Sequence, residues 1–281
     1  MLESLGARVM RNTLGWSWAT REGLQMQSQT ARPTPEPVAR QLRQEAAFGC
    51  CRCGYPIVQY HHIIPYAEDH HFRPEDMMAL CPNCHDAANN GAITVEQQRH
   101  HKSRPHNLKR GYAAGLLTVN DRSLQIKMGS NTFVGEGTII RADMEPLVTL
   151  DLNNSGSVEI TLNLYDERDK LVASIHKNEW ISYDPLPWDI NAGYQKLRIR
   201  RRKGLVASDL DLRQTPAHLS TSLWWRGHLI SVSPSTMCVD RNGLNCQFVG
   251  CMFERLSLLF STSPKPAVKI VHDRTHQTDT S

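Results

Sequence analysis

The spacing of hydrophobic and polar positions divides this chain near Gly115 into a mixed first part and a β-rich second part. From Pro37 to Phe48, apolar side chains recur at helical spacing with proline in the first turn, which predicts a helix. Residues 57–64 are rich in β-forming side chains and predict a strand or hairpin. The segment from Cys81 to Asn89 predicts a tight turn that opens into a short helix.

A further helix of the first part is expected to start at Thr94, because Gln97 three residues later completes a capping-box sequence. The second part of the chain has a different pattern. From Thr132 onward, short runs of β-forming residues are separated by turn signals such as NNSG, DERD and DRNG. This pattern predicts an all-β sandwich, barrel or solenoid of about 130 residues.

We therefore predict an α+β chain made of four segments. Three prolines between residues 33 and 37 form a stiff connector after an N-terminal arm. The expected limits are 1–36 for the arm and linker, 37–116 for a first domain, 130–262 for a β-rich domain and 263–281 for a loosely ordered tail.

Composition places the chain among globular proteins without a membrane segment. It has 281 residues, of which 40% are hydrophobic and 21% charged. No apolar run approaches the length of about 18 residues that a membrane helix needs, and the N-terminus lacks a signal-peptide pattern. We expect a cytoplasmic protein. The net charge of +4 is mild and does not by itself indicate nucleic-acid binding.

Cysteine spacing supplies the first chemical signal. Five of the eight cysteines lie between residues 50 and 84, where Cys50/Cys53 and Cys81/Cys84 form two Cys-x-x-Cys pairs. Each pair suits a tight turn that aims two sulfurs at one tetrahedral ion, so the four predict a structural Zn²⁺ site. Cys51 falls outside this spacing. We expect the other three to be small buried side chains: Cys238, Cys246 and Cys251.

A group of imidazole and amide side chains accompanies the cysteines. His61 and His62 lie between the two pairs, in the run His-His-Ile-Ile-Pro, and His85 directly follows the last cysteine. His85 and Asn89 are four residues apart and would share one face of a helix. These positions predict a second metal site with nitrogen and oxygen ligands. For His70, His71 and Asp69, a solvated loop is the expected environment.

Taken together, the two cysteine pairs, the HHIIP run and the ALCPNCH segment resemble the His-Asn-His (HNH) endonucleases over roughly residues 37–115. The resemblance implies a ββα-metal fold around one divalent cation. It implies that His62 is the general base and that His61 and His85 are catalytic metal-site residues, with Asn89 completing the ligands. The family's central asparagine falls at Asp76, which implies a loop-orienting role for an acid instead of an amide.

Elementary chemistry agrees with these implied roles. An imidazole titrates near neutrality and can accept a proton from water, while a cation stabilises the charge that develops on a phosphate. The Asn89 oxygen favours Mg²⁺ or Mn²⁺ as the catalytic ion, and the two histidines leave Zn²⁺ or Ni²⁺ open.

Two groups of cations are candidate nucleic-acid surfaces, each weighed against an ordinary solvated face. The first group follows the metal sites and consists of Arg99, Lys102, Arg104, Lys109 and Arg110. The second lies in the β-rich domain and consists of Arg198, Arg200, Arg201, Arg202 and Lys203. Trp180 and Trp224-Trp225 are expected to be core or interface residues.

The sequence thus predicts a metal-dependent enzyme that hydrolyses DNA phosphodiester bonds, with double-stranded DNA implied by the family resemblance. The alternative is a catalytically inactive, zinc-stabilised nucleic-acid-binding or adaptor module. The β-rich domain carries no motif with a mechanism. It could recognise a target, bind a protein partner, form oligomers or regulate the nuclease, and by analogy such fusions resemble prokaryotic defence or restriction effectors.

Overall fold

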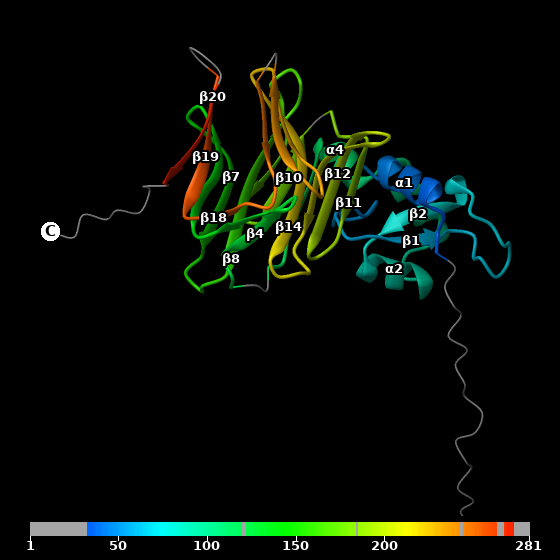
Figure 1. Ribbon diagram of the computed structural model, residues 1–281. Coiled ribbons are helices and arrows are strands. Elements are labelled where there is room, and N and C mark those ends of the chain that lie inside the picture. The colour runs from blue at the N-terminus through cyan, green and yellow to red at the C-terminus, as the bar shows by residue number, and fades with distance from the viewer. Residues whose placement is uncertain (1–32, 120–121, 184, 242–243, 263–266, 273–281) are drawn as a thin grey trace, which may run out of the picture. The chain divides into compact units, whose positions relative to one another are not determined.

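Helices and one small hairpin come first in the chain, and strands make up the rest. The computed structural model describes residues 33–119, 122–183, 185–241, 244–262 and 267–272 (Figure 1). Most of the expected N-terminal arm lies outside these residues, and so do residues 263–266 and 273–281 of the expected tail. Within the described chain, no helix is long and apolar enough to cross a membrane.

From residue 33 onward, the first part of the chain contains four α-helices, a 3-10 turn and a two-stranded hairpin. In chain order the elements are α1 Glu36–Glu45, β1 Gln59–His62, η1 Pro74–Asp76, β2 Met77–Leu80, α2 Pro82–Asn89, α3 Val95–Ser103 and α4 His106–Arg110.

Local sequence accounts for where these elements begin and end. Pro37 occupies the first turn of α1, and the helix stops before Ala47 and Phe48, both of which have positive φ. Thr94 caps α3 with the capping box that the sequence predicts. Of the strand or hairpin expected over residues 57–64, the structure shows a strand, β1, which pairs antiparallel with β2 so that His62 lies opposite Met77.

Two large sheets contain the remaining strands. The eight-stranded sheet has the order β20-β19-β6-β7-β8-β9-β10-β3, so β3 lies at its edge. Its strands are β3 Tyr112–Leu116, β6 Gly137–Ala142, β7 Glu145–Leu152, β8 Val158–Tyr165, β9 Leu171–His176, β10 Glu179–Tyr183, β19 Leu256–Ser261 and β20 Ala267–His272. Strand β3 thus extends this sheet from within the segment expected as the first domain, and β20 forms within the expected tail.

The ten-stranded sheet runs in the order β11 to β17, with three short strands beside it. Strand β4 pairs with β14 and β5, and β18 pairs with β5. The strands of this sheet are β4 Gln125–Met128, β5 Asn131–Val134, β11 Asp189–Ala192, β12 Lys196–Arg202, β13 Leu205–Asp211, β14 Ala217–Trp225, β15 His228–Val232, β16 Met237–Arg241, β17 Leu244–Phe248 and β18 Met252–Glu254.

One hydrophobic core lies between the two sheets. Alternate side chains along β8 are buried, as expected for a strand with one face inward. Ile160 and Leu162 of this strand share a core cluster with Leu210 and Leu219 of the other sheet. The β region is therefore a sandwich, and the predicted α+β class is confirmed. Trp180 is buried in this core, as expected, whereas Cys238, Cys246 and Cys251 are only partly buried, contrary to expectation.

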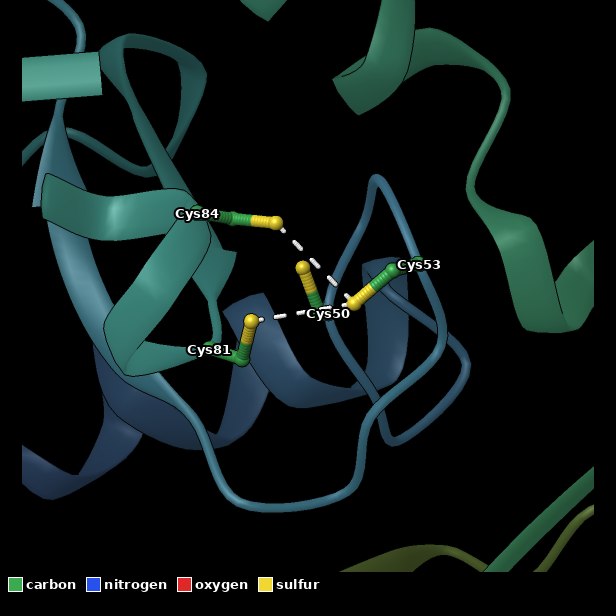
Figure 2. Close-up of side chains that lie close together, drawn as sticks. All are labelled: Cys50, Cys53, Cys81 and Cys84. Atoms are coloured by element: carbon green, nitrogen blue, oxygen red, sulfur yellow. Dashed lines mark hydrogen bonds between the residues drawn. The ribbon is translucent and has the colours of Figure 1, made fainter. Parts of the chain in front are cut away.

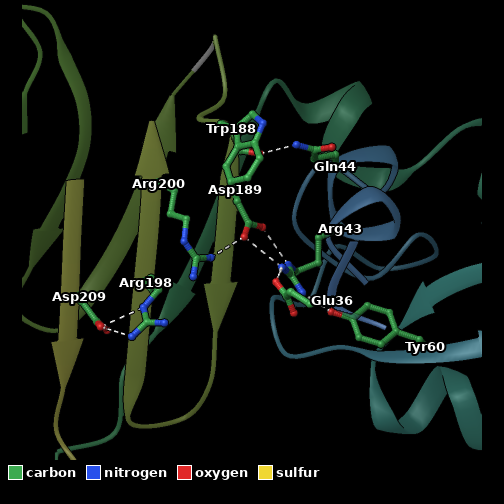
Figure 3. Close-up of polar contacts among 9 residues, drawn as sticks. All are labelled: Glu36, Arg43, Gln44, Tyr60, Trp188, Asp189, Arg198, Arg200 and Asp209. Carbon is green, nitrogen blue, oxygen red and sulfur yellow. Dashed lines mark hydrogen bonds and ion pairs between the residues drawn. The ribbon is translucent and has the colours of Figure 1, made fainter. Parts of the chain in front are cut away.

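A buried ion pair joins α1 to the sandwich (Figure 3). Arg43 and Asp189 of β11 are 4% and 0% exposed, and two hydrogen bonds of 2.9 and 3.0 Å connect them. Arg43 also donates to the Tyr60 hydroxyl on β1, and Arg200 of β12 reaches the same Asp189 carboxylate at 2.8 Å. Burial opposes the charge of Arg43, yet the hydrogen bonds that it donates to Asp189 and Tyr60 raise its pKa above the ordinary value.

Asp189→Asn tests how much this link contributes to stability. The variant leaves two guanidinium groups facing a neutral amide in a buried site, so we expect the free energy of unfolding to fall by about 3–5 kcal/mol. Denaturation in urea measures it. The matched control is Asp209→Asn, which removes a half-exposed pair with Arg198 and should cost less than about 1 kcal/mol. Equal losses in the two variants would contradict the assignment.

Candidate functional site

The first cysteine turn is held by backbone hydrogen bonds and close packing. The Cys50 amide donates to the Tyr55 carbonyl, and the Gly54 amide donates to the Cys50 carbonyl, both at 2.8 Å. Gly54 has a φ of +78°, and a Cβ atom there would lie 2.4 Å from the Asn107 side chain. Asn107, fully buried on α4, donates to the carbonyls of Gly54 and Ala47. Helix α4 therefore fixes the shape of this turn.

The second cysteine turn is the start of a helix. Cys81 is the N-cap residue of α2, Pro82 follows in the first turn, and Cys84 lies on the same turn. The His85 amide donates to the Cys81 carbonyl at 2.8 Å, which places His85 directly after the thiols. The turn thus sets the direction of the helix that carries His85 and Asn89.

The four thiols converge on one point (Figure 2). The sulfurs of Cys50, Cys53, Cys81 and Cys84 all lie within 4.8 Å of one another. The Cys53 sulfur is 3.6 Å from that of Cys81 and 4.0 Å from that of Cys84. Tetrahedral Zn²⁺ with bonds of about 2.3 Å needs sulfurs about 3.8 Å apart. The four cysteines are therefore arranged to bind a structural metal such as zinc.

Electrostatics around the thiols also suits a cation. Burial raises the pKa of Cys50 and of Cys84 to about 11, so without an ion these groups hold their protons. A bound divalent ion reverses this balance because it stabilises the thiolates. The Arg52 guanidinium lies 3.9 Å from the Cys84 sulfur and offsets part of the negative charge of four thiolates.

Cys51 is not part of the cluster, as the spacing predicts. It is buried beside the hairpin, where its amide donates to the Ala79 carbonyl at 2.9 Å. Burial raises the pKa of its thiol to about 12.

His61 and His85 lie together beside the hairpin. Their ring centroids are 5.1 Å apart, in an edge-to-face arrangement. His61 Nε2 is 3.0 Å from Gln98 Oε1, and the amide nitrogen of Gln98 donates to the Ile93 carbonyl. Since Gln98 therefore presents its oxygen, His61 carries its proton on Nε2 and keeps a lone pair on Nδ1 for a metal. Burial lowers the pKa of His61 to about 4, which keeps the ring neutral.

Asn89 completes this group on α2. Its amide nitrogen lies 3.5 Å from His85 Nδ1, one helical turn away. Burial lowers the pKa of His85, so its imidazole is also biased toward the neutral form that binds metals. The structure thus brings together three of the side chains that the sequence singles out, His61, His85 and Asn89.

His62 faces a different set of partners from His61, its neighbour on β1. Its Nε2 lies 3.0 Å from the His71 carbonyl, and its ring packs edge-on against Tyr66. A carbonyl only accepts, so Nε2 is the protonated nitrogen and Nδ1 is left as a proton acceptor. Burial lowers the pKa of His62, which favours this neutral form. This is the protonation state that a general base needs.

The solvated loop environment expected for His71 is wrong, because its side chain is buried and only 5% exposed. Its Nδ1 accepts from the Arg73 amide at 3.1 Å, and its Nε2 donates to the Ile64 carbonyl at 3.2 Å. The ring thus braces the loop between the strands of the hairpin, and its own carbonyl holds His62.

Asp76 anchors the same loop through two arginines. Its carboxylate pairs with Arg73 at 3.1 Å and with Arg99 of α3 at 2.6 Å. The hydrogen bonds from Arg99 and Arg73 lower the pKa of Asp76, so it remains ionised. Asp69 also pairs with Arg73 from the exposed side of the loop. The recorded partners of the Asp76 carboxylate are thus Arg73 on the loop and Arg99 on α3.

The two basic groups are partly used inside the fold. Arg99 and Lys102 are paired with Asp76 and Glu45, whereas Arg104 and Lys109 are exposed and Arg110 lies over the Tyr112 ring. In the second group, Arg198, Arg200 and Arg201 pair with Asp209, Asp189 and Glu167. In that group only Arg202 and Lys203 are exposed, so the arginines of β12 do not form a continuous exposed basic stripe.

Gln98, His71 and Asn107 are the site residues that the motifs do not reveal. All three are polar side chains that are buried. Gln98 could have been found from its position on the inner face of the predicted helix after Thr94. His71 and Asn107 lie in loop-like sequence with no periodic signal.

A comparison with known families agrees with the geometry. The model of the HNH endonuclease family matches residues 50–91, which span both cysteine turns, the hairpin and α2. This segment is an HNH endonuclease domain. The HNH domain indicates a nuclease-type function, since such domains generally act on nucleic acids. No curated protein and no solved structure matches the chain.

Metal analysis of Cys53→Ser tests the thiol site. The wild-type chain should bind one zinc ion, and loss of one thiolate should release it and expose the HNH domain to proteolysis. Inductively coupled plasma mass spectrometry of the dialysed protein measures the amount of zinc per chain. Cys238→Ser, outside the cluster, is the control and should retain zinc. Full zinc content in Cys53→Ser would contradict the assignment.

Proposed function

We propose that this chain is a metal-dependent endonuclease that hydrolyses phosphodiester bonds in DNA. The observation that carries the proposal is that two neighbouring histidines of the hairpin, His61 and His62, have different surroundings. His61 joins His85 and Asn89 with its Nδ1 available to a metal, while His62 is bound at Nε2 by a carbonyl and offers Nδ1 to water.

The possible ligands include both nitrogen and oxygen atoms, so they suit more than one divalent cation. The amide oxygen of Asn89 favours Mg²⁺ or Mn²⁺, and the imidazoles of His61 and His85 leave Zn²⁺ or Ni²⁺ as further candidates. When bound, such an ion stabilises negative charge on the phosphate and on the leaving oxygen. Gln98 fixes the ring of His61, and the cysteine turn fixes the helix that carries the other two ligands.

The protein's own step is proton transfer at His62. A water molecule that attacks phosphorus gives its proton to His62 Nδ1, while the Nε2–H bond to the His71 carbonyl keeps the ring in place. The new P–O bond forms as the bond to the leaving oxygen breaks, and solvent returns a proton to that oxygen. Because the ring stays neutral at rest, it is ready to accept the proton at neutral pH.

Double-stranded DNA is the proposed substrate, as the family resemblance implies. The sandwich is tied to the hairpin by the buried Arg43 network, which contacts Tyr60 two residues from His62. This link supports a role for the sandwich in presenting nucleic acid to the HNH domain.

Plasmid nicking by His62→Ala tests the proposed base. Loss of a general base should lower the rate by about 10²–10⁴-fold in Mn²⁺ or Mg²⁺. His70→Ala, on the exposed loop nearby, is the matched control and should keep wild-type activity. Wild-type activity in His62→Ala, or cleavage without added divalent metal, would exclude this mechanism. An inactive zinc module would show no cleavage in any variant.

Asp76→Asn tests the support of the base. Weakening both arginine pairs loosens the loop that holds the His71 carbonyl, so kcat should fall about 10-fold, the usual scale for losing an orienting partner. KM and zinc content should stay unchanged. Asp69→Asn removes only the exposed partner of Arg73 and should change kcat less than about two-fold. Equal effects in the two variants would show that Asp76 has no special role.

A further inference from the structure

An open groove lies where the HNH domain meets the edge of the eight-stranded sheet. Its volume is about 890 Å³. One wall is the first cysteine turn, from Cys53 to Pro56, and the other consists of β3 and the neighbouring outer strands; Tyr194 also lines the groove. None of the residues proposed to bind the catalytic metal lines it.

The groove is unusually rich in tyrosine. Four of the seven tyrosines of the chain line it. Three of them are substantially exposed: Tyr55 at 43%, Tyr183 at 36% and Tyr194 at 56%. Their rings are thus outside the hydrophobic core, although an exposed aromatic ring gains little from contact with water. Such a cluster indicates a surface that another molecule covers.

The walls of the groove are preformed. A Cβ atom on Gly115 would lie 2.6 Å from Pro56 Cγ and 2.8 Å from the Trp180 indole nitrogen. The cysteine turn therefore packs directly on the sheet at this glycine, and Trp180, 2% exposed, supports the contact from below. Binding in the groove does not require the two walls to come together.

Positive charge borders the aromatic surface. The Arg110 guanidinium lies 3.9 Å from the centre of the Tyr112 ring and lines the groove. Arg104 and Lys109 are exposed on the segment that leads to Arg110, and within the described chain no ion pair is recorded for either. Glu179 is the single carboxylate of the lining. Cations at the rim and aromatic faces inside are the combination that holds a phosphate backbone and its unstacked bases.

We propose that this groove binds single-stranded nucleic acid, whose bases stack on the tyrosines while Arg110 contacts a phosphate. The inference rests on the proposed nuclease function and narrows its substrate class. Cys53 lines the groove and its sulfur lies 4.0 Å from that of Cys84, which directly precedes His85. An unpaired stretch held here therefore lies beside the metal centre that orients the catalytic helix. Preferred substrates would contain a single-stranded segment next to duplex.

Binding to a labelled oligothymidylate, followed by fluorescence anisotropy, tests the inference. The measurements use the full chain with His62→Ala and no added Mg²⁺ or Mn²⁺, so that binding is read without cleavage. Adding Tyr194→Ala should weaken binding about 5- to 100-fold, the range for losing one stacked base. Tyr194→Phe should bind as the parent does, because it keeps the ring. A blunt duplex of equal length should bind the Tyr194→Ala protein within about two-fold of its parent.

Charge has its own matched pair of variants. Arg110→Ala should weaken oligothymidylate binding and reduce its dependence on salt by about one phosphate contact. Arg202→Ala removes an exposed cation outside the groove and should have little effect on either.

A second measurement uses no substitution, so its result does not depend on whether a variant folds correctly. Oligonucleotides with 4-thiothymidine, cross-linked to the protein without any substitution, should label peptides that contain Tyr55, Tyr112 or Tyr194. Cross-links confined to other segments, or equal affinity in Tyr194→Ala, would overturn the inference. Binding of an extended peptide to the edge of β3 that the oligonucleotide cannot displace would also overturn it. Because these assays measure binding alone, an inactive nuclease that still binds would refute the proposed function and leave this site standing.

Discussion

The convergence of four thiols from two distant turns is the constraint on which the functional site depends. Cys53 and Cys81 are 28 residues apart in the chain, yet their sulfurs lie 3.6 Å apart. The core around them is a small cluster in which alanines and the cysteines themselves lie beside four larger apolar residues: Ile63, Met78, Leu80 and Ile93. Ligation of zinc by such a site contributes on the order of 10 kcal/mol, which is comparable to the whole stability of a typical domain. A metal bound by the four thiols would thus add to the small hydrophobic core of this region.

The thiol site also determines where the histidines of the candidate metal site lie. Because Cys81 caps α2, the direction of the helix and the height of His85 above the hairpin are set by the thiol site. The hairpin then places neighbouring histidines in different surroundings. His61 faces Gln98 and His85, whereas His62 faces the His71 carbonyl. One short strand can therefore supply both a metal ligand and a base.

The sandwich contributes a second kind of order. Its core is large and apolar, so it does not need a metal, and Phe48 from the chain before the first cysteine is buried in it. The Arg43–Asp189 pair adds a polar contact with fixed geometry between α1 and β11. Such a pair gains little stability over an apolar contact but allows only one alignment of its partners. We infer that alignment of the HNH elements with the sheet edge is its main contribution.

Sequence patterns predicted the local parts of this molecule better than the long-range ones. The thiol cluster and the hairpin could be predicted because each depends on spacing within a short segment. The edge position of β3 could not, since strand order depends on pairing with β10, more than sixty positions along the chain. The same holds for Arg198 and Arg200: the sequence singled them out as a candidate nucleic-acid surface, but their acidic partners come from neighbouring strands. His71 was misjudged because burial of a polar loop residue leaves no periodic signal.

Binding of Mn²⁺ to the zinc-loaded protein, followed by the electron paramagnetic resonance signal of the free ion, tests the two-site account most directly. The account predicts that the wild-type chain takes up one Mn²⁺ while its zinc remains in place. It also predicts that His85→Ala loses Mn²⁺ binding and keeps zinc. Uptake of Mn²⁺ that is unchanged in His85→Ala, or that displaces zinc from the wild-type protein, would contradict it.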